Sequence, residues 1–135
     1  MTHSAHILAI HPVTHNVRRY VVERPEGYAF EAGQATEVSI DRPGWTERKS
    51  PFTSLSEWDN LEFTIKSYRD HDGVTNALWD LVPGDRLLLR DVWGTITYGG
   101  PGIFIAGGAG VTPFIAILRR LHQDGTLAGN RLIVS

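Results

Sequence analysis

The stretch IFIAGGAGVTPFIAILRR, Ile103 to Arg120, changes character twice along its length. It opens with the apolar run IFIA, which is long enough for a buried strand of a parallel sheet. The small-residue turn GGAG follows at 107–110. Thr112 then suits a helix N-cap, and Pro113 suits the first helical position. The stretch therefore predicts a strand, a glycine turn and a helix that ends at Gly125.

A helix that starts directly after a glycine turn is suited to binding phosphate. Free backbone N–H groups point outward there, the helix dipole adds partial positive charge, and glycines allow a close approach. The turn departs from the GxGxxG fingerprint, because Pro113 stands where the third glycine would be. Two interpretations stay open, a nucleotide site and a tight strand–helix connection. Arg119 and Arg120, near the helix end, are expected to complement its dipole.

Length and composition favour one ordinary globular domain. The chain has 135 residues, 41% of them hydrophobic and 21% charged, and a net charge of -2. This balance gives no argument for nucleic-acid binding. The absence of cysteine excludes disulfides, thiolate metal sites and cysteine nucleophiles. Residues 1–8 lack the apolar run of a signal peptide, and no segment suits a membrane-spanning helix, so we expect a cytoplasmic protein.

Upstream of residue 100 the sequence reads as short strands separated by turn residues. Between 61 and 68 polar and apolar side chains alternate, which is the pattern of a half-buried strand with Glu62, Thr64 and Lys66 on its polar side. We expect one short helix at 75–81, and strands at 6–13, 17–23, 35–40, 49–55, 61–68, 86–90 and 95–98.

These elements predict a mainly β fold. We expect a six-stranded antiparallel Greek-key barrel with one short helix, followed by the first β-α-β unit of a parallel α/β nucleotide-binding domain. The boundary near 99–102 gives a barrel domain at 1–100 and the beginning of a second domain at 101–135. A two-stranded parallel sheet normally lies inside a larger one, so we expect a truncated chain whose exposed apolar surface favours self-association. Alternatively, the last segment packs onto the barrel or pairs with another copy.

Several short pieces occur in a recognisable order along nearly the whole chain. They are Gly33-Gln34 before a strand, RKSPFTSL at 48–55, LEFTIKSY at 61–68, Gly73-Val74-Thr75, Pro83-Gly84-Asp85, Trp93-Gly94 and GGAGVTP at 107–113. Together they resemble the flavin domain of the ferredoxin–NADP reductase superfamily, specifically its flavodoxin-reductase-like members. The resemblance implies a barrel that binds FAD beside an NAD(P)H-binding domain. It also implies an oxidoreductase that passes electrons to flavodoxin, ferredoxin or an iron centre on a partner.

The family's central motif is an arginine, any residue, an aromatic residue and then Ser or Thr. The resemblance implies that the arginine neutralises the FAD pyrophosphate, the aromatic ring packs on the isoalloxazine, and the hydroxyl donates to flavin N5. Counted from Arg48, Ser50 takes the aromatic place and Pro51 takes the hydroxyl place, where proline cannot donate. In the other register, Phe52 and Thr53 supply the aromatic ring and the hydroxyl, and Ser50 replaces the arginine.

Alternation leaves both registers open, because a shift of two residues keeps the same strand face. We expect Arg48 on the phosphate, and Phe52 with Thr53 near the flavin. The departure from the motif puts ordinary N5 chemistry in question. The alternative is a plain barrel strand with Phe52 packed inside.

The resemblance also implies a second phosphate contact at Gly73, Val74 and Thr75. A glycine before a short helix offers backbone N–H groups to a pyrophosphate. An ordinary helix cap at Asp72 or Thr75 is the alternative. Further residues are implied at the ribityl and adenine end of the flavin, namely Ile65, Lys66 and Tyr68. Lys66 by itself would read as a solvated strand charge.

Gly107, Gly108 and Gly110 would face the nicotinamide nucleotide. Thr112 would cap the helix and lie close to the flavin, which makes Thr53 and Thr112 the expected catalytic residues. Ser135 ends the second strand, where the ribose or 2′-phosphate of a nucleotide is often read.

Two other functions remain open, a non-catalytic flavin- or nucleotide-binding module and a barrel interaction domain without a ligand. The truncated chain need not be active by itself. We expect no metal, because the N-terminal histidines do not share one strand face and no acidic cluster joins them.

Overall fold

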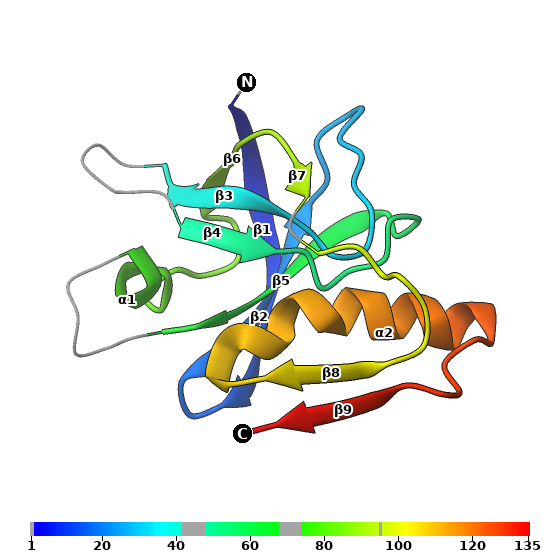
Figure 1. Cartoon of the computed structure of the whole chain (residues 1–135). Helices are drawn as coiled ribbons and strands as arrows, with labels where there is room; N and C mark the ends of the chain where they lie inside the picture. The colour runs from blue at the N-terminus through cyan, green and yellow to red at the C-terminus, as the bar shows by residue number, and fades with distance from the viewer. Residues whose placement is uncertain (1, 42–47, 68–73, 95) are drawn as a thin grey trace.

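A computed structural model describes residues 2–41, 48–67, 74–94 and 96–135 of the chain. Its architecture is mainly β, with a nearly closed barrel and a small parallel sheet covered by a helix (Figure 1). The predicted fold class is confirmed. The strands are β1 His3–Thr14, β2 Val17–Glu23, β3 Gln34–Ile40, β4 Arg48–Pro51, β5 Asn60–Lys66, β6 Arg86–Leu89, β7 Trp93–Gly94, β8 Ile103–Ala106 and β9 Arg131–Val134. The helices are α1 Val74–Leu78, the 3-10 helix η1 Gly108–Val111 and α2 Thr112–Asp124.

The barrel is a single antiparallel sheet that curls until its two ends meet. Its hydrogen-bonded order is β4-β3-β6-β1-β2-β5, and β7 adds to β3. The ends come together where Phe52, just past β4, pairs with Phe63 of β5. There the Thr53 amide donates to the Glu62 carbonyl at 2.9 Å. This closing contact brings the expected flavin motif directly against β5.

Aromatic rings fill the barrel beside this closing contact. Phe30 and Phe52 stack with ring centroids 4.2 Å apart, and Phe63 lies 5.1 Å from Phe52. Tyr28 meets Phe52 edge-on at 6.1 Å. Such pairs stabilise a core beyond the area they bury. Phe52 is therefore a central member of the core.

Two side chains of β2 hold the short helix α1. The Tyr20 hydroxyl donates to the Leu78 carbonyl at 3.1 Å. Arg18 Nη1 donates to the Trp79 carbonyl at 2.8 Å, and its guanidinium lies 3.6 Å over the Trp79 ring. A helix of this length has little stability of its own, so these contacts determine where α1 lies.

Tyr20→Phe is expected to lower the free energy of unfolding by about 1 kcal/mol, because the Leu78 carbonyl loses its buried donor. Burial raises the pKa of Tyr20 from 10.0 to about 12. A pKa raised in the folded state stabilises the protein fully below the unfolded value and loses that effect as pH rises through the folded value. The difference between wild type and variant should therefore be full below pH 10.0 and shrink toward pH 12. Urea denaturation measures it, and equal midpoints at neutral pH would contradict the prediction.

The second unit is the strand–helix–strand segment predicted from the glycine turn. β8 and β9 pair in parallel, from Ile103 opposite Arg131 to Ala106 opposite Val134. The helix α2 ends at Asp124, and Gly125, with φ at 75°, is its left-handed cap, as predicted. No helix in the described ranges is both long and apolar enough to cross a membrane.

The predicted elements differ from the observed ones most clearly at three places. The strand predicted at 49–55 ends at Pro51, and α1 runs from Val74 to Leu78 rather than over 75–81. The strand predicted at 95–98 is wrong for residues 96–98. Instead, Trp93 and Gly94 pair with the start of β3 and take its free edge.

Candidate functional site

The carboxyl ends of β8 and β9 meet at the glycine turn. The Ser135 amide donates to the Ala106 carbonyl at 3.1 Å, and the Gly108 amide donates to the Ser135 carbonyl at 3.2 Å. Gly107, Gly108 and Gly110 are all exposed. A Cβ added at Gly108 or Gly110 would meet nothing within 4 Å, so the backbone there is open on the outside. An exposed turn before a helix start is a geometry that can accept an anion.

The start of α2 differs from the prediction in one detail. Val111 is the N-cap, with φ -70° and ψ -23°, and no side chain caps the helix. Thr112 is the first helical residue, so its predicted role as N-cap is wrong. The physical reason is the preceding 3-10 turn, in which the Gly110 amide donates to the Gly107 carbonyl at 2.9 Å and the chain enters α2 already helical.

The expected flavin motif lies mostly inside the barrel. Phe52 has 0% exposed surface, and Phe30 and Phe63 pack against its ring. Phe52 therefore has no exposed face on which a ring outside the barrel could stack. These surroundings match the alternative interpretation, a plain barrel strand with Phe52 packed inside. Ser50 is also buried, and Pro51 is half-buried. A role for Phe52 at a flavin stays a prediction that would require its exposure.

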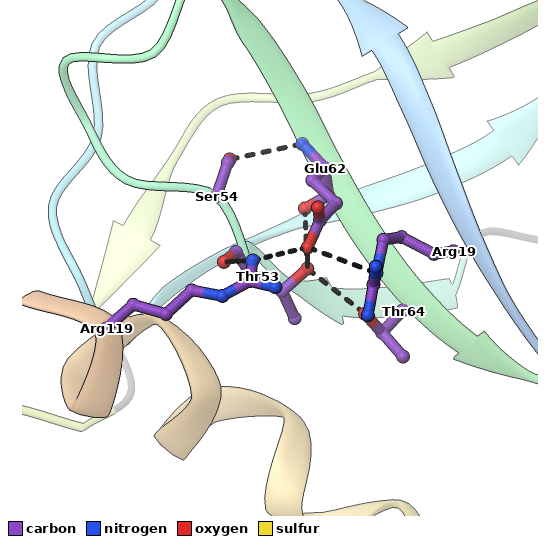
Figure 2. Close-up of polar contacts among 6 residues, drawn as sticks. All are labelled: Arg19, Thr53, Ser54, Glu62, Thr64 and Arg119. Carbon is purple, nitrogen blue, oxygen red and sulfur yellow. Dashed lines mark hydrogen bonds and ion pairs between the residues drawn. The ribbon is translucent and has the colours of Figure 1, made fainter. Parts of the chain in front are cut away.

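Thr53 lies in a polar cluster with Arg19, Ser54, Glu62, Thr64 and Arg119 (Figure 2), in which Thr53, Ser54 and Glu62 are buried and the two arginines are partly exposed. Its hydroxyl donates to Glu62 Oε1 at 2.6 Å and lies 3.1 Å from Thr64 Oγ1. Arg119 Nη1 donates both to Glu62 Oε1 and to the Thr53 carbonyl, each at 2.7 Å. The structure thus gives the Thr53 proton a different acceptor from flavin N5. Its catalytic role stays a prediction and would require the hydroxyl to leave Glu62.

Glu62 is the centre of this cluster. Its side chain is 8% exposed, and a buried carboxylate is costly unless it is paired and hydrogen-bonded. Arg119 pairs with it directly, and Arg19 Nε lies 3.7 Å from the same oxygen. The Glu62 amide donates to Ser54 Oγ at 3.1 Å. The side chain, the backbone and the charge of Glu62 are therefore all engaged.

Neither Glu62 nor Arg119 was expected at the site. Alternation placed Glu62 on the polar face of a half-buried strand, but α2 reaches that face through Arg119. Arg119 was read as a cation at a helix end. The sequence offered only an acidic residue on β5 and two neighbouring arginines on α2. Nothing in it indicates which of these charges form a pair.

The remaining predicted residues are placed as follows. Ile65 points into the barrel core, and Lys66 is half-buried at the end of β5, opposite Val17. Arg48 pairs with Val38 through the β3–β4 ladder. Val74 and Thr75 open α1, whereas Tyr68 and Gly73 lie outside the described residues.

Most of these segments lie on one side of the molecule. In the view of Figure 1 the start of β4, the end of β5, α1 and the start of α2 all lie toward the left.

Within the described ranges, no group of three or more His, Cys, Asp or Glu side chains could hold a metal ion.

A second polar contact joins α2 to the barrel. Arg120 Nη2 donates to Ser56 Oγ at 3.1 Å and to Glu57 Oε2, and Arg120 Nη1 lies 3.7 Å from Asp124. The Arg120 hydrogen bond is the main cause that lowers the pKa of Glu57 below its usual 4.5. Both side chains are partly exposed, so this pair contributes less than the Glu62 cluster.

Glu57→Gln is expected to reduce the fall in thermal midpoint that the wild-type protein shows at acidic pH. A carboxylate with a lowered folded pKa stabilises the protein above its unfolded value, and this effect is lost as pH falls through the folded value. The difference in thermal midpoint between wild type and Glu57→Gln should be largest above pH 4.5 and vanish below the lowered pKa. Glu26→Gln, at an exposed carboxylate elsewhere, is the control. Parallel wild-type and Glu57→Gln curves would contradict the prediction.

Several known reductases are similar to this chain in sequence. No protein-family model matches the chain. It is 30% identical over 127 residues to the reductase component of propane 2-monooxygenase from Rhodococcus jostii, which covers 88% of the chain and 34% of that protein. It is 29% identical over 131 residues to ferredoxin–NADP reductase B from Sorangium cellulosum, which covers 92% of the chain and 54% of that protein. The chain thus spans about a third to a half of the curated relatives it matches.

Solved structures share the fold. A ferredoxin NADP+ reductase from Neisseria gonorrhoeae with bound FAD and NADP superposes with a TM-score of 0.83 at 24% identity, covering 98% of this chain and 56% of that one. Phthalate dioxygenase reductase gives 0.80 at 18% identity, covering 98% and 42%. The chain has the fold of these reductases, and its predicted resemblance to the ferredoxin–NADP reductase superfamily is confirmed.

Proposed function

We propose that the chain is the FAD-binding part of an oxidoreductase that passes electrons from NAD(P)H to a one-electron acceptor. The observation that carries the proposal is the joining of a nearly closed barrel to a strand–glycine turn–helix unit whose open turn lies at the carboxyl ends of β8 and β9. The curated relatives support it, since they include reductase components of monooxygenases and a ferredoxin–NADP reductase. The division into 1–100 and 101–135 is part of this proposal.

The residues present fit the phosphates of the cofactors better than the flavin ring. The exposed glycines 107, 108 and 110 leave room for a nucleotide against the backbone. Arg48, with the start of α1 at Val74 and Thr75, would hold the FAD pyrophosphate. The buried ring of Phe52 does not fit a stacking role as it lies.

When bound, the flavin would accept a hydride from NAD(P)H and release electrons singly, which is chemistry that the cofactor supplies. The chain would bind it, orient it and limit access of water. Lys66 would lie toward the ribityl and adenine end. Thr112, half-buried at the start of α2, would lie nearest the flavin among the residues of that helix.

Reconstitution with excess FAD, followed by gel filtration and a visible spectrum, tests the proposal. At free FAD about 100-fold above the dissociation constant, linkage predicts a stabilisation of about 2.7 kcal/mol. Protein that emerges colourless and with an unchanged thermal midpoint would refute the proposal.

A non-catalytic flavin-binding module is the second candidate. The observation that favours it is that the Thr53 hydroxyl, the expected donor to flavin N5, donates to Glu62 instead. Rapid bleaching of bound FAD by NADH or NADPH would eliminate this candidate. A comparison of the bleaching rates with NADH and with NADPH would show which dinucleotide is preferred.

The acceptor is proposed to be a flavodoxin, a ferredoxin or an iron centre on a partner domain. We also propose a cytoplasmic location and self-association through the apolar side chains that β8 and β9 expose, of which Ile105 is 73% exposed. Light scattering that gives a monomer at high concentration would count against the self-association.

A further inference from the structure

We propose that Arg119 is a positioning residue that, through Glu62, fixes helix α2 and its glycine turn onto the closing contact of the barrel. The coupling itself follows from the contacts around Glu62. Its consequence for flavin chemistry rests on the proposed function.

One guanidinium nitrogen joins three elements. Arg119 Nη1, on α2, donates to the Glu62 carboxylate of β5 and to the Thr53 carbonyl just past β4, each at 2.7 Å (Figure 2). The Thr53 hydroxyl donates to the same Glu62 oxygen at 2.6 Å. Charge-assisted hydrogen bonds are among the stronger and more directional polar contacts, and the Glu62 side chain that accepts here is 8% exposed. Because one nitrogen makes both bonds, a displacement of Arg119 Nη1 away from the barrel lengthens both together.

This contact lies where it can orient the glycine turn. Arg119 is two helical turns beyond Thr112, and a helix rises about 1.5 Å per residue, so it acts roughly 10 Å from the helix start. Thr53 belongs to the expected flavin motif, and the glycine turn would face the dinucleotide. Reacting atoms must approach to about 3–3.5 Å for transfer, so a contact that fixes the two segments relative to each other controls that approach.

Arg19 explains why the contact can be tested without losing the fold. Its Nε is buried, has no hydrogen-bond partner among the residues that the structure describes, and lies 3.7 Å from Glu62 Oε1. When Arg119 is replaced, Glu62 keeps a neighbouring cation. We therefore expect Arg119→Met to loosen α2 while the barrel stays folded.

Hydrogen–deuterium exchange on the full chain tests the coupling without any cofactor. In Arg119→Met, amide exchange over 113–121 should rise on the order of ten-fold, with β1 and β2 unchanged, because only the local opening of α2 becomes easier. Arg119→Met also removes the guanidinium carbon that lies 5.2 Å from the centre of the Trp58 ring. Glu62→Gln leaves that contact in place, so it separates the role of the Glu62 contact from that of Trp58. Arg119→Lys should recover part of the protection, because an ammonium can donate to both oxygens.

Arg120→Met is the matched control, since the neighbouring arginine binds a partly exposed acid. It should change exchange over 113–121 by less than about three-fold, in keeping with the small contribution of surface pairs. Glu62→Gln, which keeps an acceptor but loses the charge, should raise exchange over 113–121 to an intermediate degree. Wild-type exchange in either Arg119→Met or Glu62→Gln would overturn the proposal.

A second arm repeats the measurement at saturating FAD. FAD should slow exchange of 113–121 in wild type and not in Arg119→Met, at equal bound flavin by visible spectrum. Bound FAD without slower exchange in wild type would overturn the positioning role while leaving the proposed function intact. Absence of bound FAD would refute the proposed function, and the cofactor-free arm would still decide the coupling.

Discussion

Replacement of Phe52 by alanine is expected to lower the free energy of unfolding by about 3–5 kcal/mol, the range found for truncating a large buried aromatic residue. Its side chain is fully buried, and three aromatic rings meet it. It also stands at the residue where the barrel closes onto Phe63. Urea denaturation followed by far-ultraviolet circular dichroism measures the loss.

The same experiment separates a core role from a cofactor role for Phe52. Phe52→Leu keeps most of the buried volume, so it should retain more stability than Phe52→Ala. Phe114→Ala, at a half-buried aromatic residue on α2, is the control for general truncation and should cost less than Phe52→Ala. If Phe52→Ala unfolded at the wild-type midpoint but bound FAD weakly, the ring would be a cofactor contact rather than core.

The local elements were predictable because each has a local cause. The apolar run, glycine turn and Pro113 predicted the β8–α2 unit, and Gly125 ends α2 with a left-handed φ. The alternation at 61–68 predicted β5. Turn residues between short apolar runs predicted an antiparallel barrel, and that is the sheet observed.

The closing contact and the Glu62 cluster were not predictable, because both depend on which segments meet in space. Phe52 could stack on a flavin or fill the core, and a two-residue shift of register preserves the strand face in either case. Alternation identified Glu62 as polar-facing, but it does not say what covers that face. The partner Arg119 lies 57 residues away in the chain, a separation at which no local pattern applies.

Gly33 shows how the barrel and the second unit approach each other closely. Its φ is 93°, and its carbonyl accepts the Ile96 amide at 3.3 Å. A Cβ added there would lie 2.1 Å from the Ile96 carbonyl oxygen and 3.1 Å from Ile117 Cδ1 of α2. Both the backbone conformation and the space at this position therefore require glycine.

Gly33→Ala is accordingly expected to cost roughly 3 kcal/mol, from the strained φ together with overpacking. Gly84→Ala is the matched control, since Gly84 has φ at 98° but a Cβ there would meet nothing within 4 Å. It should show only the backbone strain, about 1 kcal/mol. The difference between the two variants in free energy of unfolding, measured by urea denaturation, isolates the cost of the clash between the added Cβ and Ile96 and Ile117. Because the added Cβ would press on Ile117 of α2, Gly33→Ala should also speed amide exchange over 113–121, whereas Gly84→Ala should not. Equal losses in the two variants would mean that backbone strain alone requires glycine at residue 33.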